Sequence, residues 1–142
     1  MSQTYPGRCL CGAVEMQGRG AVELGVCHCS MCRRWTGGPF FGVQFADGLE
    51  ITKGDALRWY QSSPWAERGF CGSCGATLFY RFKVGAGELH ATAGPFDLPA
   101  GAAIAQHIFV EEKPAYYEFA DEAPRRTGAE LMAEYQAKMS QR

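Results

Sequence analysis

The chain has 142 residues, of which 46% are apolar and 20% are charged, as is usual for one soluble globular domain. Its 14 basic and 15 acidic residues give a net charge of −1, which argues against a dedicated nucleic-acid-binding protein, because such binding depends on neutralising phosphates. No run of about 18 apolar residues is present, so we expect no membrane-spanning helix. The first residues contain no apolar signal region, and we therefore expect a cytoplasmic protein.

Short strands separated by turns dominate the predicted secondary structure. In chain order we expect strands over residues 13–17, 23–27, 41–45, 49–53, 57–60, 77–82, 89–93 and 104–110. These stretches are rich in aromatic and β-branched residues, and 18 glycines and 7 prolines supply turns between them. The pattern favours a sandwich, a barrel or a bent antiparallel sheet, and it disfavours a parallel sheet because strands and helices do not alternate.

Two helices are predicted. The first begins near Ser30, which we expect to be its N-cap, and it ends by Gly37. The second covers residues 128–138 after a linker over residues 120–128, and Thr127 with Glu130 fits a capping box. Apolar residues at every fourth position form a stripe that we expect to dock on the body of the same domain, namely Leu131, Tyr135 and Met139.

Seven cysteines fall into groups of two, three and two: Cys9 and Cys11, then Cys27, Cys29 and Cys32, then Cys71 and Cys74. The last pair has the spacing of a metal knuckle, and Gly75 would close its turn in the left-handed conformation. The first pair would point to one side of an extended strand. Together the two pairs predict a closed four-thiolate zinc site with a structural role, because no coordination position is left for a substrate.

The middle group predicts a second, open zinc site. Cys27, Cys29 and Cys32 supply three ligands, and the helix N-terminus after Ser30 favours a thiolate at Cys32. Three ligands and one exchangeable position are typical of catalytic zinc. Three thiolates on Zn²⁺ leave a charge of about −1, so the open position suits an incoming thiolate better than a hydroxide.

Residues directly after the third cysteine of this group are the predicted substrate contacts. Arg33 and Arg34 would offset the charge of a thiolate or bind a substrate carboxylate. Trp35 would line the pocket, although core packing is the more common role of such an aromatic residue. His28 and His107 are expected to be packed and hydrogen-bonded rather than metal ligands.

Three other interpretations of the cysteines are weaker. A redox Cys-x-x-Cys motif belongs in a thioredoxin-like βαβ setting, which the sequence does not show. A disulfide framework does not suit an odd number of cysteines in a cytoplasmic chain. Inert buried cysteines would not be expected at these spacings.

Three blocks resemble the glutathione-dependent formaldehyde-activating enzyme family, also described as the centromere-protein-V-type group. They are residues 7–14 (GRCLCGAV), 27–33 (CHCSMCR) and 69–75 (GFCGSCG), and residues 106–110 (QHIFV) with Lys113 and Pro114 resemble a late strand of the family. The likeness covers about residues 5–120. It implies bent antiparallel sheets of the β-tent type, a structural zinc on Cys9, Cys11, Cys71 and Cys74, and a second zinc on Cys27, Cys29 and Cys32.

The resemblance also implies an activity. It is a carbon–sulfur lyase reaction whose reverse joins glutathione and formaldehyde into S-(hydroxymethyl)glutathione, with Cys27, Cys29 and Cys32 at the catalytic zinc. We expect residues 1–120 to form the zinc-binding β domain, with a linker and a docked helix over residues 121–142, in a monomer or weak homodimer. The alternative is a non-catalytic zinc-binding module that binds a small thiol or a protein partner.

Overall fold

The computed structural model describes residues 3–140, apart from the side chain of residue 139. The chain divides into two compact units. The first contains the first and last cysteine pairs, and the second contains the middle group of three cysteines. The first unit comprises the described residues up to 24 together with residues 42–102, and the second comprises residues 25–41 and 103–140. Two strands pass from one unit to the other, β3 (Val22–Cys27) and β4 (Phe40–Phe45).

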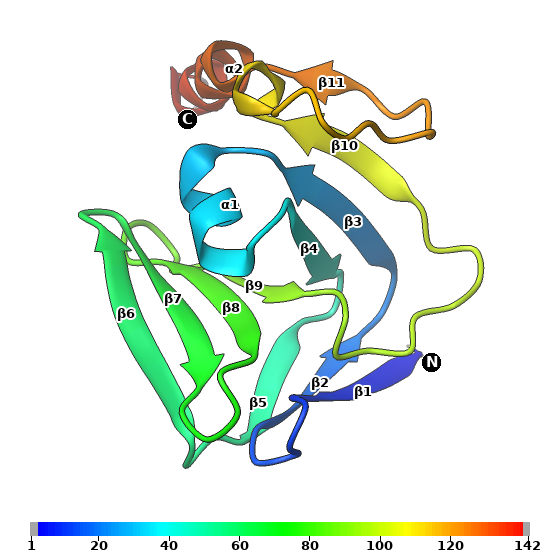
Figure 1. Cartoon of the computed structure of the whole chain (residues 1–142), viewed down its shortest axis with the longest axis vertical. Helices are drawn as coiled ribbons and strands as arrows, with labels where there is room; N and C mark the ends of the chain where they lie inside the picture. The colour runs from blue at the N-terminus through cyan, green and yellow to red at the C-terminus, as the bar shows by residue number, and fades with distance from the viewer. Residues whose placement is uncertain (1–2, 141–142) are drawn as a thin grey trace. The chain divides into compact units, whose positions relative to one another are not determined.

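The first unit consists of antiparallel strands, as the sequence predicts. Its strands are β1 (Thr4–Arg8), β2 (Glu15–Arg19), β5 (Leu49–Lys53), β6 (Leu57–Ser63), β7 (Ala66–Cys71), β8 (Thr77–Phe82) and β9 (Leu89–Thr92). One sheet has the order β1-β2-β5, and the other part of the unit has the order β4-β9-β8-β7-β6. Figure 1 shows β6, β7 and β8 side by side in green.

Two strands of this unit were not predicted. β1 contains Pro6 and lies at the edge of its sheet, where a residue without a backbone N–H is tolerated. β7 contains Glu67 and Gly69, residue types that are depleted in strands, yet it lies between β6 and β8. Arg68 is buried with its guanidinium 4.9 Å from the centre of the Tyr80 ring, so cross-strand contacts decide this strand rather than local propensity.

The core of the first unit is apolar and includes two of the cysteines. Its buried members are Cys9, Val14, Met16, Val43, Phe45, Cys71, Leu78, Phe79, Ala91 and Phe96. The sheet with β2 approaches this core closely at Gly18, where an added Cβ would lie 2.5 Å from carbons of the Phe45 ring. Only glycine therefore fits at position 18. Cys9 and Cys71 are members of the same packed core.

The second unit contains both helices. After β3 come α1 (Ser30–Thr36), β10 (Ile104–Ile108), the 3₁₀ helix η1 (Val110–Glu112), β11 (Arg125–Arg126) and α2 (Gly128–Ser140), and the strand order is β11-β10-β3-β4. β10 and β11 pair in parallel over two residues, and β11 lies within the stretch predicted as a linker. β10 ends earlier than predicted, because Phe109 has a φ of 55° and cannot continue a strand.

The capping box predicted for α2 is confirmed. The N–H of Glu130 donates to Thr127 Oγ1 and the N–H of Thr127 donates to Glu130 Oε1, each at 3.1 Å. The apolar stripe is only partly buried, because Leu131 is half-buried and Tyr135 is exposed, and the side chain of Met139 lies outside the described residues. Neither helix in the described part of the chain is long and apolar enough to cross a membrane.

Candidate metal and thiol sites

The first and last cysteine pairs meet in the first unit. The sulfurs of Cys9, Cys11, Cys71 and Cys74 all lie within 4.8 Å of one another. Cys9 Sγ is 3.7 Å from Cys11 Sγ, and Cys11 Sγ is 3.8 Å from Cys71 Sγ. Four sulfurs at about 2.3 Å from a tetrahedral zinc would be about 3.8 Å apart, so the donor set and its spacing fit this metal.

Both pairs lie in turns. Cys71 ends β7, its sulfur accepts hydrogen bonds from the N–H groups of Ser73 and Cys74 at 3.4 Å, and Gly75 has a φ of 79°, as the sequence predicts. The prediction that Cys9 and Cys11 lie on an extended strand is wrong. β1 ends at Arg8, and the positive φ of Gly12, 80°, turns the chain after Cys11.

Backbone N–H groups stabilise negative charge on these sulfurs. The N–H of Val14 donates to Cys9 Sγ at 3.3 Å. Hydrogen bonds from the backbone of Ala76 and of Cys11 lower the pKa of the Cys74 thiol to about 6. A thiolate is the form that binds a metal, so these hydrogen bonds favour the metal-binding form of Cys9 and Cys74.

The middle cysteine group forms a second cluster in the second unit. The sulfurs of Cys27, Cys29 and Cys32 lie within 4.8 Å of one another. Cys27 is the last residue of β3, and Cys32 is buried in the first turn of α1. The N-cap of α1 is Cys29 and not Ser30, because Cys29 Sγ accepts the N–H of Cys32 at 3.3 Å. The sulfur of Cys29 therefore caps the helix in place of the serine hydroxyl that the sequence predicts.

The three clustered thiols are better suited to binding a cation than to lying together without one. Hydrogen bonds with Cys29 and Cys32, together with burial, raise the pKa of the Cys27 thiol. Three thiolates at this spacing repel one another, and a divalent cation among them would remove that repulsion. The group offers three sulfurs and no fourth cysteine among the described residues, so the donor set fits a metal with one position left for another ligand.

His28 lies between Cys27 and Cys29 in the chain, but both of its ring nitrogens are hydrogen-bonded to residues other than these cysteines. Its Nδ1 is 2.8 Å from Tyr117 Oη, and its Nε2 is 2.8 Å from His107 Nδ1. His107 Nε2 is 3.0 Å from both carboxylate oxygens of Asp121. The expectation that both histidines are packed and hydrogen-bonded is confirmed, and burial with the neighbouring His107 lowers the pKa of His28 to about 4.

Sequence reasoning did not find the partners of these histidines. Tyr117 and Asp121 come from the segment after η1, which has no periodic pattern. The Phe119 ring makes T-shaped contacts with both imidazoles, with ring centres 5.6 Å and 5.0 Å away. The signal available in the sequence was a polar and aromatic stretch, residues 113–121, close after the strand with His107.

The predicted substrate contacts occupy three different surroundings on α1. Arg33 donates from Nε to the carbonyl of His28 at 3.3 Å, so it supports the cysteine loop. Arg34 is exposed, and its side chain is accessible to a ligand. Trp35 is half-buried, and its ring centre lies 5.7 Å from that of the buried Phe40, which agrees with a packing role.

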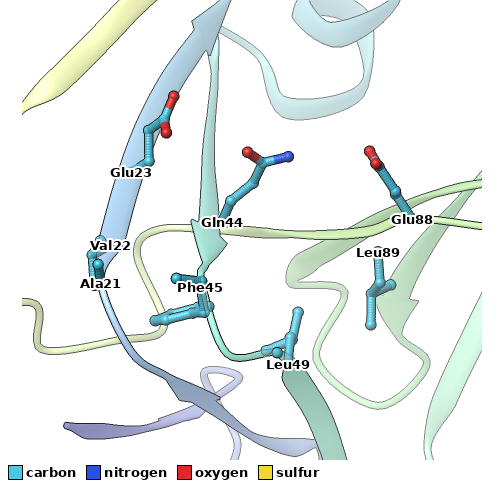
Figure 2. A pocket seen from close by; sticks show the side chains of 10 residues that line it. Ala21, Val22, Glu23, Gln44, Phe45, Leu49, Glu88 and Leu89 are labelled. Atoms are coloured by element: carbon cyan, nitrogen blue, oxygen red, sulfur yellow. The ribbon is translucent and has the colours of Figure 1, made fainter. Parts of the chain in front are cut away.

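A hollow of about 500 Å³ in the first unit contains no cysteine. Figure 2 shows the polar ends of Glu23, Gln44 and Glu88 on one side of it, and Phe45 with Leu89 on the other. Its acidic rim would repel the carboxylates of a thiol such as glutathione.

Comparisons with known proteins show which family the chain resembles. A family model described as glutathione-dependent formaldehyde-activating enzyme matches residues 4–112. A Schizosaccharomyces pombe protein described as an uncharacterized lyase is 30% identical over 131 residues, which cover 90% of this chain and 94% of that protein. A solved protein from Rhodobacter sphaeroides is 23% identical, with 84% of this chain and 98% of that chain covered and a TM-score of 0.49. The chain belongs to the glutathione-dependent formaldehyde-activating enzyme family.

Proposed function

We propose that the protein is a zinc-dependent carbon–sulfur lyase acting on adducts of a thiol and a carbonyl compound, with glutathione and formaldehyde as the leading pair. The observation that carries the proposal is the group of three sulfurs, Cys27, Cys29 and Cys32, within 4.8 Å of one another. Membership of the family and the lyase description of the S. pombe relative support the reaction class.

The two cysteine clusters would hold zinc in different roles. The four sulfurs in the first unit would close a coordination shell, which suits a structural ion. The three sulfurs in the second unit would hold an ion with one free position, and such an ion lowers the pKa of a thiol that reaches it. The chain itself supplies no fourth cysteine there among the described residues.

The bond changes are simple in this reaction. The thiolate sulfur attacks the carbonyl carbon, the electron pair of the C=O double bond moves to oxygen, and that oxygen takes up the proton released by the thiol. The reverse reaction breaks the carbon–sulfur bond. We assign the exposed guanidinium of Arg34 to a carboxylate of the thiol substrate, where it would position the sulfur.

The alternative is a non-catalytic module that binds a thiol or a protein partner through the same cysteines. Zinc content and activity separate the two. The enzyme should contain up to two zinc ions, and Cys32→Ser should lose only the second. It should also accelerate exchange between glutathione and formaldehyde, measured by NMR, in a manner that Cys32→Ser abolishes. Two bound zinc ions without acceleration would favour the binding module or another thiol substrate.

A further inference from the structure

Four side chains of the second unit form one continuous hydrogen-bond chain, Tyr117–His28–His107–Asp121. His28 and His107 are each 1% exposed, so no bulk water competes for their ring nitrogens. Asp121 also accepts, at Oδ2, the N–H of Ala123 at 3.0 Å and Arg125 Nη1 at 3.3 Å. The chain therefore ends on a carboxylate that is itself held in place.

The carboxylate fixes the direction of the whole chain. Burial alone would raise the pKa of Asp121, but hydrogen bonds from His107 and from the Ala123 N–H outweigh it and keep that pKa low. An ionised carboxylate only accepts, so His107 Nε2 must donate to it. At a pH above the ordinary imidazole pKa of about 6.5 each imidazole is neutral and has one N–H. His107 Nδ1 then accepts from His28 Nε2, and His28 Nδ1 accepts from the Tyr117 hydroxyl.

The loop with the cysteines is held at the same residue. The N–H of His28 donates to the carbonyl of Ile108 at 3.1 Å, and the carbonyl of His28 accepts from Arg33 Nε. Two residues on, the N–H of Ser30 donates to Glu112 Oε1 at 3.0 Å. With its backbone and both ring nitrogens bonded, His28 fixes the chain between Cys27 and Cys29.

We propose that Asp121 is a positioning residue that sets the direction of the hydrogen-bond chain and, through His107 and His28, fixes the loop of Cys27 and Cys29 in the arrangement that binds a metal. The inference rests on the proposed function for the metal at this loop. It adds a positioning role for the segment after η1. Neither histidine would be a metal ligand in this arrangement. In known sites, loss of a group hydrogen-bonded to a metal ligand weakens metal binding by about 10- to 100-fold, and Asp121, which acts through two histidines, should give an effect near the lower end of that range.

Replacing the carboxylate by an amide tests the direction. In Asp121→Asn the amide oxygen should remain at the position that faces two donors, the Ala123 N–H and Arg125. The NH₂ group then faces His107 Nε2 and donates to it. Each proton along the chain must consequently move to the other nitrogen, so that both imidazoles are protonated on Nδ1.

The experiment is ¹H–¹⁵N NMR of the histidine rings in the zinc-loaded full chain at about pH 8, above the ordinary imidazole pKa of about 6.5. We expect Nε2–H on His28 and His107 in the wild type, and Nδ1–H on both in Asp121→Asn. Nδ1–H or an imidazolium ring in the wild type would overturn the inference, and so would unchanged protonation in Asp121→Asn.

Cobalt titration tests the consequence for the metal. Cys32→Ser identifies the absorption of the four-cysteine site, which then reports in every variant that the first unit is folded. Asp121→Ala should weaken Co²⁺ binding at the three-cysteine site by about tenfold or more and leave the four-cysteine site unchanged. Glu122→Ala, which removes the exposed carboxylate next in the chain, should change neither.

The outcomes separate this inference from the proposed function. A wild type that binds a single Co²⁺ ion contradicts the proposed function at its metal site. A wild type that binds two ions, with unchanged affinities in Asp121→Ala, overturns the positioning role of Asp121 alone.

Discussion

Cys11 Sγ lies 3.8 Å from Cys71 Sγ, although 60 residues separate them in the chain. A metal held by these sulfurs would close a long loop, and closure of long loops is where such a link removes the most entropy from the unfolded chain. Cys9 and Cys71 also belong to the buried core. Metal binding at this cluster and folding of the first unit should therefore be coupled.

We predict that Cys71→Ser lowers the melting temperature by roughly 10 °C or more, because loss of a structural metal is among the few single changes that cost about 4 kcal/mol. Cys32→Ser is the matched control and should melt within a few degrees of the wild type, since its cluster is open. Scanning calorimetry of both variants with measured zinc content checks this. Equal melting temperatures for the two variants would contradict the structural role of the first cluster.

Gly75 offers a test of the knuckle that changes no ligand. Its φ of 79° is unfavourable for any side chain, although a Cβ there would meet no atom within 4 Å. Gly75→Ala should therefore cost about 1–2 kcal/mol in the free energy of unfolding. Gly38→Ala also places its Cβ in open space, at a residue without a positive φ, and should be neutral or slightly stabilising. Urea unfolding measures both, and equal effects would argue against backbone strain at the knuckle.

The sequence was sufficient to predict the strands whose residues agree with a pleated, half-buried surface. β5 and β8 have the predicted bounds. Their β-branched or aromatic residues favour a strand whatever segments lie beside them. β7 could not be predicted, because its charged residues are stabilised only by β6 and β8, including Arg81, whose Nε donates to Glu67 Oε1 at 2.8 Å. Such strands depend on partners distant in sequence.

The site likewise combines features that follow from the local sequence with features that depend on distant residues. Cysteine spacing predicts both clusters, because each pair or triplet is local and sulfur chemistry is specific. The N-cap at Cys29 was missed, because serine is the usual capping residue and the sulfur takes that role only in this local geometry. Tyr117 and Asp121 were missed, because only the folded chain brings them to His28 and His107.

The capping box of α2 gives a third prediction. Thr127→Ala removes the acceptor for the Glu130 N–H and should cost about 1 kcal/mol, seen as faster amide hydrogen exchange in the first turn of α2. Thr127→Ser keeps the hydroxyl and serves as the control. Unchanged exchange in Thr127→Ala would show that the helix start is held by other contacts, such as the Gly128 N–H on Glu111.

Asp121 gives a prediction of pH dependence. Burial opposes ionisation of this carboxyl, but the hydrogen bonds from His107 and Ala123 prevail and lower its pKa below the ordinary 3.8. Its contribution to stability is therefore complete above pH 3.8 and is lost as the pH falls through the lowered pKa. The difference in unfolding free energy between wild type and Asp121→Asn should close over that range. A difference that grows on acidification would contradict the sign.

Arg34 gives a prediction for substrate binding. Because its guanidinium is exposed, Arg34→Gln should weaken glutathione binding by no more than about fivefold, the effect of one solvent-exposed ion pair. Arg19→Gln, at an exposed arginine that pairs with Glu50 in the first unit, should have no effect. Calorimetric titration of the zinc-loaded proteins measures the affinities. Should Arg33→Gln and Arg34→Gln together leave the affinity unchanged, neither arginine binds the thiol.

The most direct measurement for the central claim is the rate of exchange between glutathione and formaldehyde, followed by NMR with both cysteine clusters loaded with zinc. The three-cysteine group should raise this rate in proportion to protein concentration, and Cys32→Ser, with the four-cysteine site still filled, should return it to the rate without protein. Exchange at that uncatalysed rate in the fully loaded wild type would contradict the assignment of the lyase reaction with this pair to this site.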